Sequence, residues 1–175
     1  MAAFRMATCR MFDKMLQLCA CEASVAIEAC AKVIDGKYIA KQIRDEISAE
    51  ASRMKEAIGV VPGLAVVLVG DRKDYAPYVR NKKKACESVG INSFEVHLLT
   101  DSKEEDVLEF ISGFNDDPSV HGILVQLPLP SHMNLQRILN AVTIEKDVDG
   151  FHPLNIGQLA MMGREPLFVP CTPKG

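Results

Sequence analysis

Leu64-Ala65-Val66-Val67-Leu68-Val69 is an uninterrupted apolar run that ends at Gly70. A short apolar run without alternation, bounded by turn residues, is typical of a strand that is buried on both faces, as in parallel sheets. Val61-Pro62-Gly63 comes just before the run and ends any helix that precedes it. The stretch therefore predicts a strand inside a sheet, followed by a turn.

Helical and strand patterns alternate around this run. Upstream, Ile39, Ile43 and Ile47 recur every four residues and predict the buried face of a long helix that extends to about Ala57. The elements predicted downstream are a helix from about Pro77 to Val89 ended by Gly90, a strand over 94–99, a helix from a capping box at Ser102 and Glu105 through Phe114, a strand over 122–127, and a short helix over 135–142.

This rhythm predicts an α/β fold with a mostly parallel sheet flanked by helices. In such folds, ligands gather beyond the carboxyl ends of the strands. Two polar or proline-rich segments directly follow apolar strands, at 70–74 and at 126–130. We therefore expect the functional residues in or near these segments.

The composition narrows the class of ligand. The chain has 175 residues, enough for one domain, and a net charge of −3, so no global field favours nucleic acid or an anionic membrane. No apolar run is long enough to cross a bilayer. The cysteines lack the paired spacing of a zinc site or a disulfide framework, which predicts reduced thiols in an intracellular compartment. A small molecule is the expected partner, without nucleic acid, membrane or metal.

Residues 1–31 differ from the rest of the chain. Arg5, Arg10 and Lys14 lie among Met, Ala, Leu and Phe residues, which resembles a transit peptide, but Asp13 and the scarcity of serine do not fit that pattern. The segment is thus either a targeting peptide or an extension without function. We predict a cytoplasmic protein, with a mitochondrion or plastid as the alternative if the segment is a transit peptide.

Tyr78 and Lys82 are four residues apart on a predicted helix, so their side chains share one face. An aromatic ring can stack on a flat heterocycle while a partly desolvated lysine exchanges a proton with the ligand or with water. The alternative is a core tyrosine beside a lysine of the solvated run 80–84. Spacing alone favours this alternative, because surface lysines greatly outnumber catalytic ones.

Two further side chains are candidates for ligand contacts. Gln126 closes an apolar strand with an amide that either faces a polar partner or points to solvent. Asp147-Val148-Asp149-Gly150 offers a carboxylate that can accept two parallel hydrogen bonds from a pterin-like edge, although a turn or a metal site has the same letters. The glycine-rich fingerprints for dinucleotides and nucleoside triphosphates are absent, so we expect no cofactor-binding residue in this chain.

Five segments together are more specific than any one of them. They are 69–74 (VGDRKD), 78–86 (YVRNKKKAC), 122–130 (GILVQLPLP), 146–153 (KDVDGFHP) and 170–175 (PCTPKG). Their content and order resemble the catalytic domain of the methylenetetrahydrofolate dehydrogenase/cyclohydrolase family, with plant and bacterial members most similar. The resemblance covers about residues 32–175.

The resemblance implies NADP-dependent oxidation of 5,10-methylenetetrahydrofolate and hydrolysis of the methenyl product to 10-formyltetrahydrofolate at one site. It implies that Tyr78 stacks on the folate, that Lys82 is the main cyclohydrolase residue, and that Gln126 keeps Lys82 and substrate in register. Leu127 and Pro128 are implied as substrate contacts, and Asp149 as the ligand of the pterin edge. Full-length members are expected to be homodimers.

Two departures from the family pattern bear on activity. Tyr75 and Pro77 stand where the family usually has small hydroxyl residues. In addition, the chain stops where the resemblance leads us to expect a Rossmann domain with the nucleotide site. We therefore expect the dehydrogenase step to fail in this chain alone and the cyclohydrolase step to persist weakly. The rival hypothesis is a noncatalytic remnant that binds folate or associates with full-length subunits.

Overall fold

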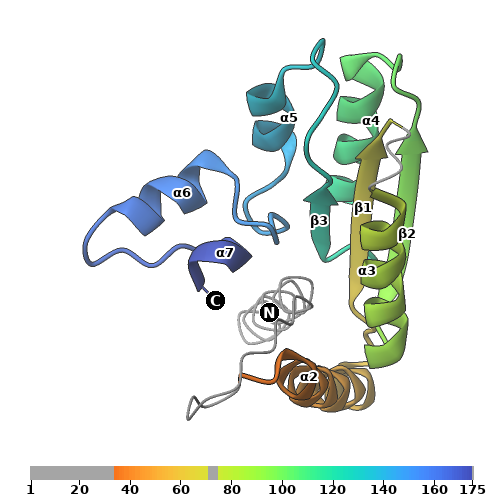
Figure 1. The fold of residues 1–175 in the computed structure, drawn as a ribbon, viewed down its shortest axis with the longest axis vertical. Coiled ribbons are helices and arrows are strands. Elements are labelled where there is room, and N and C mark those ends of the chain that lie inside the picture. Colours follow the sequence, from red (N-terminus) through yellow and green to blue (C-terminus); the bar gives the residue numbers. More distant parts are fainter. Residues whose placement is uncertain (1–33, 71–74, 175) are drawn as a thin grey trace, which may run out of the picture.

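A computed structural model of the protein describes residues 34–70 and 75–174, and the side chains of residues 34–70 and 80–172. Helices and strands alternate along most of the chain (Figure 1). The elements are α2 (Gly36–Ile58), β1 (Gly63–Val69), α3 (Tyr75–Val89), β2 (Asn92–Leu98), α4 (Glu104–Asp116), β3 (Gly122–Val125), α5 (Leu135–Ala141), α6 (Pro153–Ala160) and α7 (Cys171–Lys174).

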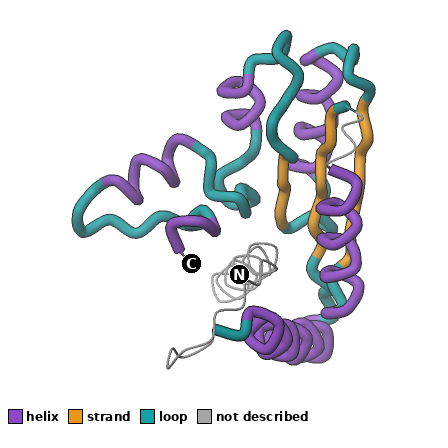
Figure 2. Tube along the Cα trace, in the orientation of Figure 1, coloured by secondary structure: helices purple, strands orange, loops and turns teal. Residues whose placement is uncertain are grey.

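Within the described residues, β1 is the middle strand of a three-stranded sheet with the order β2-β1-β3. Both pairings are parallel, with Gly63 opposite Asn92 and Leu64 opposite Gly122. The three strands lie side by side in Figure 2. Every residue of β1 is buried. The α/β fold with a parallel sheet is confirmed, and the carboxyl ends of all three strands lie at the same edge.

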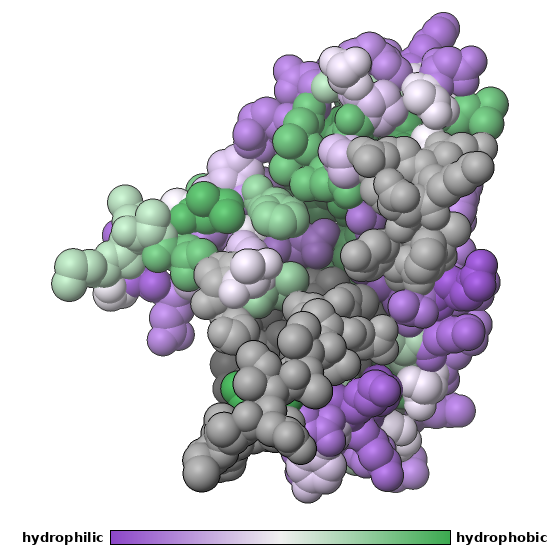
Figure 3. All heavy atoms as spheres, in the orientation of Figure 1, coloured by the Kyte–Doolittle hydropathy of each residue, from purple (hydrophilic) through white to green (hydrophobic). Residues whose placement is uncertain are grey.

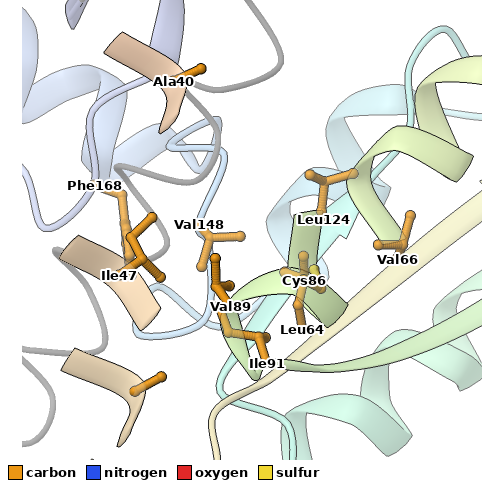
Figure 4. Packing of buried hydrophobic residues seen from close by; sticks show 11 residues of the cluster. Ala40, Ile47, Leu64, Val66, Cys86, Val89, Ile91, Leu124, Val148 and Phe168 are labelled. Carbon is orange, nitrogen blue, oxygen red and sulfur yellow. The ribbon is translucent and has the colours of Figure 1, made fainter. Parts of the chain in front are cut away.

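The two faces of β1 pack into separate apolar clusters. Leu64 and Val66 belong to a first cluster with residues of α2 and α3, seen in Figure 4. Ala65, Val67 and Val69 belong to a second cluster with residues of α4 and α5. The run 64–69 is apolar at every position because the sheet is covered on both sides.

The buried face of α2 differs from the prediction. Ile47 is buried, but Ile39 is 36% exposed, and Ala40 lies inward in its place. A step of four residues turns a helix by about 400°, so a strict four-residue repeat drifts off the contact face by about 40° at each step. The helix ends at Ile58, one residue after the predicted Ala57. Asp35 is its N-cap, and Gly59 is in the left-handed conformation at its C-terminus.

The start of α4 was also predicted one residue too early. The Ser102 and Glu105 capping box is wrong, because Lys103 is the N-cap and the Asp106 carboxylate accepts a hydrogen bond from its backbone N–H at 3.1 Å. No side chain caps the helix in return, since a lysine side chain has no acceptor.

Other boundaries are also shifted. β2 begins two residues before the predicted 94–99, and β3 ends at Val125 rather than at residue 127. Pro128 lacks an N–H group, so the chain leaves the sheet soon after Gln126. Helices α6 and α7 were not predicted from the helical pattern.

A substitution at Gly63 tests the tight packing at the start of β1. A Cβ at this position would overlap the Ser119 carbonyl oxygen and lie 2.9 Å from the Phe94 ring. We expect Gly63→Ala to lower the free energy of unfolding by roughly 1 to 3 kcal/mol, as overpacking does. Urea unfolding followed by circular dichroism measures the change.

Gly113→Ala is the matched control. Gly113 lies inside α4 with nothing within 4 Å of its would-be Cβ, so alanine should stabilise the chain by about 0.5 to 1 kcal/mol. Equal unfolding midpoints for the two variants would contradict the close packing of Ser119 and Phe94 around Gly63.

Candidate functional site

Lys82 and Gln126 meet at the carboxyl edge of the sheet. The Lys82 Nζ on α3 donates a hydrogen bond of 3.0 Å to the Gln126 Oε1, just beyond β3. The other end of the same amide is also engaged, because Nε2 donates to the Leu127 carbonyl oxygen at 3.1 Å. The backbone N–H of Gln126 donates to Val67 at 2.9 Å and ties the residue to the sheet. The amide therefore presents its oxygen to Lys82 in a fixed orientation.

The residues after Gln126 differ in exposure. Leu127 is partly buried and packs against the second apolar cluster, while Pro128 is exposed. The peptide bond between them is cis. A ligand beside Gln126 would thus meet an exposed proline ring and the partly buried leucine next to it.

Asp149 belongs to the same region of the site. The residue keeps some solvent contact, but surrounding protein desolvates its carboxyl group, and this raises its pKa to about 7. The positive charge of Lys82 acts in the opposite direction and lowers the pKa, while the negative charge of Asp147 raises it further. Lys82 is therefore close enough to Asp149 for their charges to interact.

The two acids of the 147–150 segment have different environments. Asp147 is 4% exposed, and its carboxylate accepts hydrogen bonds from Phe151 N (3.2 Å), His152 N (2.8 Å) and Asn155 Nδ2 (2.8 Å). Within the described part of the chain, no donor forms a hydrogen bond with the Asp149 carboxylate. Asp147 thus has a structural set of partners, whereas Asp149 has acceptor capacity left for a ligand.

A polar network holds this segment beside β3. Ile123 N donates to the Lys146 carbonyl oxygen at 2.7 Å. The Lys146 Nζ donates in turn to the carbonyl oxygens of Phe114, Asn115 and Asp117 at 2.7 to 2.9 Å. These carbonyls lie at the C-terminal end of α4, where a cation is favourable.

The structure thus brings three of the predicted site residues, Lys82, Gln126 and Asp149, to one edge of the sheet. Tyr78 lies one helical turn before Lys82 on α3, but its side chain is outside the described residues. The side chains of Tyr75 and Pro77 and the whole of 71–74 are outside them too. The positions of these residues relative to a ligand stay predictions.

No cluster of three or more His, Cys, Asp or Glu side chains in residues 34–70 and 75–174 is arranged to hold a metal ion. His121 accepts a hydrogen bond from Gly63 N at 3.0 Å, and His152 caps α6. Neither 34–70 nor 75–174 contains a helix long and apolar enough to cross a membrane.

The family model described as tetrahydrofolate dehydrogenase/cyclohydrolase, catalytic domain, matches residues 34–149 of the sequence. This chain belongs to that family. The family model takes in Lys82, Gln126 and Asp149, so the three side chains that meet at the sheet edge all lie in the matched range.

Relatives of the family agree in sequence and in structure. The chain is 80% identical over 148 residues to bifunctional protein FolD 4, chloroplastic, and 61% identical over 143 residues to bifunctional protein FolD 1, mitochondrial, both from Arabidopsis thaliana. These matches cover 85% and 82% of this chain, but it spans only 41% of the length of each relative.

Two solved structures share the fold. The bifunctional FolD enzyme of Campylobacter jejuni superposes with a TM-score of 0.73 at 43% identity, over 80% of this chain and 49% of that one. The FolD enzyme of Trypanosoma brucei, solved with NADP and an inhibitor, superposes with a TM-score of 0.79 at 38% identity, over 82% and 49%.

Sequence reasoning missed three residues that shape this candidate site. Lys146, Asp147 and Asn155 support the turn that carries Asp149, although none of them was a predicted site residue. The acid pair at 147 and 149 was a signal, but only the tertiary donors tell the two acids apart. Nothing in the letters around Asn155 distinguishes it from a surface residue of a short helix.

The raised pKa of Asp149 gives this family member a testable pH dependence. The folded state binds the proton more tightly than the unfolded state, whose pKa is near 3.8, so the free energy of unfolding should fall as pH rises from about 4 to about 7. In Asp149→Asn this contribution is absent, and the variant should become more stable relative to wild type across that range. Urea unfolding at pH 4, 5.5, 7 and 8 measures the difference.

Asp117→Asn is the control with the opposite sign. Hydrogen bonds from Ser119 lower the pKa of Asp117, so its contribution is present above about pH 4 and is lost as pH falls further. A wild type and Asp149→Asn pair whose stability difference stays constant from pH 4 to 8 would contradict the desolvation of Asp149.

Proposed function

We propose that this chain carries the folate site of a methylenetetrahydrofolate dehydrogenase/cyclohydrolase. The observation that supports the proposal most directly is the Lys82–Gln126 hydrogen bond at the carboxyl edge of the sheet, with the Asp149 carboxyl within electrostatic range of Lys82. An amine, an amide and a desolvated carboxyl on three separate segments can bind a flat, polar heterocycle from several sides.

In the proposed binding mode, Asp149 accepts two hydrogen bonds from the amino group and adjacent ring N–H of the pterin. Its carboxylate is desolvated and has no donor among the described residues, so such a ligand supplies donors that the protein does not. Tyr78 stacks on the pterin ring, and Leu127 and Pro128 line the same side as Gln126.

In the proposed hydrolysis, water attacks the cationic methenyl carbon and loses a proton to the Lys82 amine. The carbon then carries a hydroxyl group. Its bond to N5 breaks as N5 takes the proton held by Lys82 and the hydroxyl group gives its proton to solvent, which leaves the formyl group on N10 as 10-formyltetrahydrofolate. Gln126 holds the Lys82 amine in place through its Oε1 at 3.0 Å. Lys82 acts as a general base, which requires a short distance to the attacking water.

The dehydrogenase step with NADP is part of the proposal at the level of the whole enzyme. NADP supplies the hydride acceptor, and binding of its pyrophosphate needs a glycine-rich turn between a strand and a helix. Residues 34–70 and 75–174 show no such turn, so the described residues do not fit the dinucleotide.

The rival is a noncatalytic remnant that binds folate or associates with other subunits. One observation favours association: α6 and the loop after it expose apolar side chains on a projecting part of the molecule (Figure 3). They are Leu154, Ile156, Leu159, Met161 and Met162. An exposed apolar patch of this kind often marks a contact surface.

The domain organisation belongs to the proposal as well. We propose that residues 32–175 form the folate-binding catalytic domain, that residues 1–31 are an extension, and that the nucleotide is bound by a further domain of a longer, homodimeric enzyme. The matched range 34–149 and the 41% coverage of FolD 4 support this organisation.

For the compartment, we propose an organelle rather than the cytoplasm. The relative with 80% identity is named chloroplastic and another relative is named mitochondrial. Residues 1–31 fused to a fluorescent protein should then accumulate in plastids or mitochondria of a plant cell. Diffuse fluorescence in the cytosol would contradict this proposal.

Catalysis can be tested on this chain directly. The decay of 5,10-methenyltetrahydrofolate absorbance should be faster with the chain than in buffer, and Lys82→Met should reduce that excess rate by at least about 100-fold, the typical contribution of a general base. A progress curve at several chain concentrations gives the rate.

Lys83→Met is the matched control. Lys83 is the next residue on α3, is half exposed, and pairs only loosely with Glu95 at 3.8 Å. It should keep the wild-type rate. If wild type, Lys82→Met and buffer all give the same decay while the folate still raises the melting temperature of the chain, the remnant hypothesis is correct.

A further inference from the structure

Asp147 closes the turn that carries Asp149. Its backbone oxygen accepts a hydrogen bond from Gly150 N at 3.1 Å, and its carboxylate accepts from Phe151 N and His152 N. Asp149 thus lies inside a loop that is joined to Asp147 at three successive residues. The turn cannot shift without breaking hydrogen bonds to a buried carboxylate, which are costly to lose.

Asn155 connects this turn to a second segment of the chain. Its Nδ2 donates to Asp147, while its Oδ1 accepts from Leu167 N at 3.0 Å and Phe168 N at 3.3 Å. The side chain is fully buried, and Phe168 packs in the first apolar cluster together with Val148. The asparagine amide therefore links the turn to the 167–168 segment, whose Phe168 side chain packs in the core.

The backbone at Gly150 packs closely against the 167–170 segment. Gly150 has a φ of +69°, and a Cβ there would lie 2.9 Å from Pro170. The turn and the 167–170 segment are thus in close contact as well as hydrogen-bonded.

We propose that Asp147 and Asn155 are a positioning pair for folate binding, which fixes the turn that presents Asp149 toward Lys82. Neither residue needs to touch the folate, because both act through the turn. This inference rests on the proposed function. It adds two residues on which the affinity for the pterin depends.

The effect of the Asp147 charge on Asp149 distinguishes the positioning role from a purely structural role of Asp147. Among the described residues, the charged groups that act on the Asp149 carboxyl are Lys82 on α3, which lowers its pKa, and Asp147 in the turn, which raises it. Replacing Asp147 with a neutral residue should therefore lower the pKa of Asp149, so that Asp149 ionises at a lower pH. Mere loss of stability would not produce this change.

The test uses 5-formyltetrahydrofolate, a reduced folate without the methenyl bridge that the proposed hydrolysis opens, with the 175-residue chain and two variants. Asn155→Ser should raise Kd roughly tenfold at pH 8, as expected for loss of a hydrogen bond to a buried charged group. Asp147→Asn should raise Kd at pH 8 and also move the loss of affinity at acid pH to a lower pH. Carbon-13 NMR of the Asp149 carboxyl should show the lower pKa directly.

Glu104→Gln is the control, because Glu104 also accepts hydrogen bonds from a backbone N–H and an arginine but lies on α4, away from the turn. It should leave both Kd and the Asp149 pKa unchanged. Wild-type Kd in Asn155→Ser, or an unchanged Asp149 pKa in Asp147→Asn, would overturn the positioning role. If Asp147→Asn does not fold, Asn155→Ser decides through Kd and through faster amide exchange at Phe151 and His152.

Failure of the proposed function gives a different result. If the wild-type chain does not bind 5-formyltetrahydrofolate at all, the folate site is wrong. The positioning of Asp149 is then still decided by the carboxyl pKa and by amide exchange, neither of which needs a ligand.

Discussion

Burial of β1 on both faces is the constraint on which the rest of the structure depends. Its backbone pairs with β2 and β3 in the same direction, so all three strands end at one edge. Its side chains alternate between the cluster under α2 and α3 and the cluster under α4 and α5. A residue that follows β3 and a residue on α3 therefore meet at that edge although they are 44 positions apart, as Lys82 and Gln126 do.

The chain beyond β3 forms a single parallel bridge to β3, between Ile123 and Asp147, and polar side chains hold the rest of it. Lys146 supplies donors to three carbonyls at the end of α4, and Asn115 bonds to Ala141 and Thr143 around it. Buried polar groups are tolerated when their partners are complete, and a complete network rigidifies its surroundings. The 146–150 segment is thus placed by directional hydrogen bonds in addition to the packing of Val148 in the first apolar cluster.

Sequence reasoning predicted the parts of this protein in which each residue alone shows its environment. Every residue of the run 64–69 is apolar, which indicates burial at each position, and Gly90 ends its helix because few other residues adopt a positive φ. The prediction for Ile39 was wrong because burial there depends on the exact rotation of the helix. The prediction for Ser102 was wrong because the N-cap lies one residue further along, at Lys103. Lys82, Gln126 and Asp149 were predicted chiefly from the family resemblance, since a surface lysine and a strand-end glutamine look the same in the letters.

The contrast between Asp147 and Asp149 shows why the site itself was harder to predict. Both are acids of one turn, but the donors of Asp147 come from Phe151, His152 and Asn155, whose positions exist only after the turn has folded. Asp149 has no such donors among the described residues, and burial without donors raises its pKa to about 7. Desolvation makes the charged form of a carboxyl group unfavourable, and in the proposed binding mode a ligand with two adjacent N–H groups would offset that cost. In the proposed binding mode, the free energy that desolvation of Asp149 costs the fold favours such a ligand, while the hydrogen bonds to Asp147 hold the turn in shape.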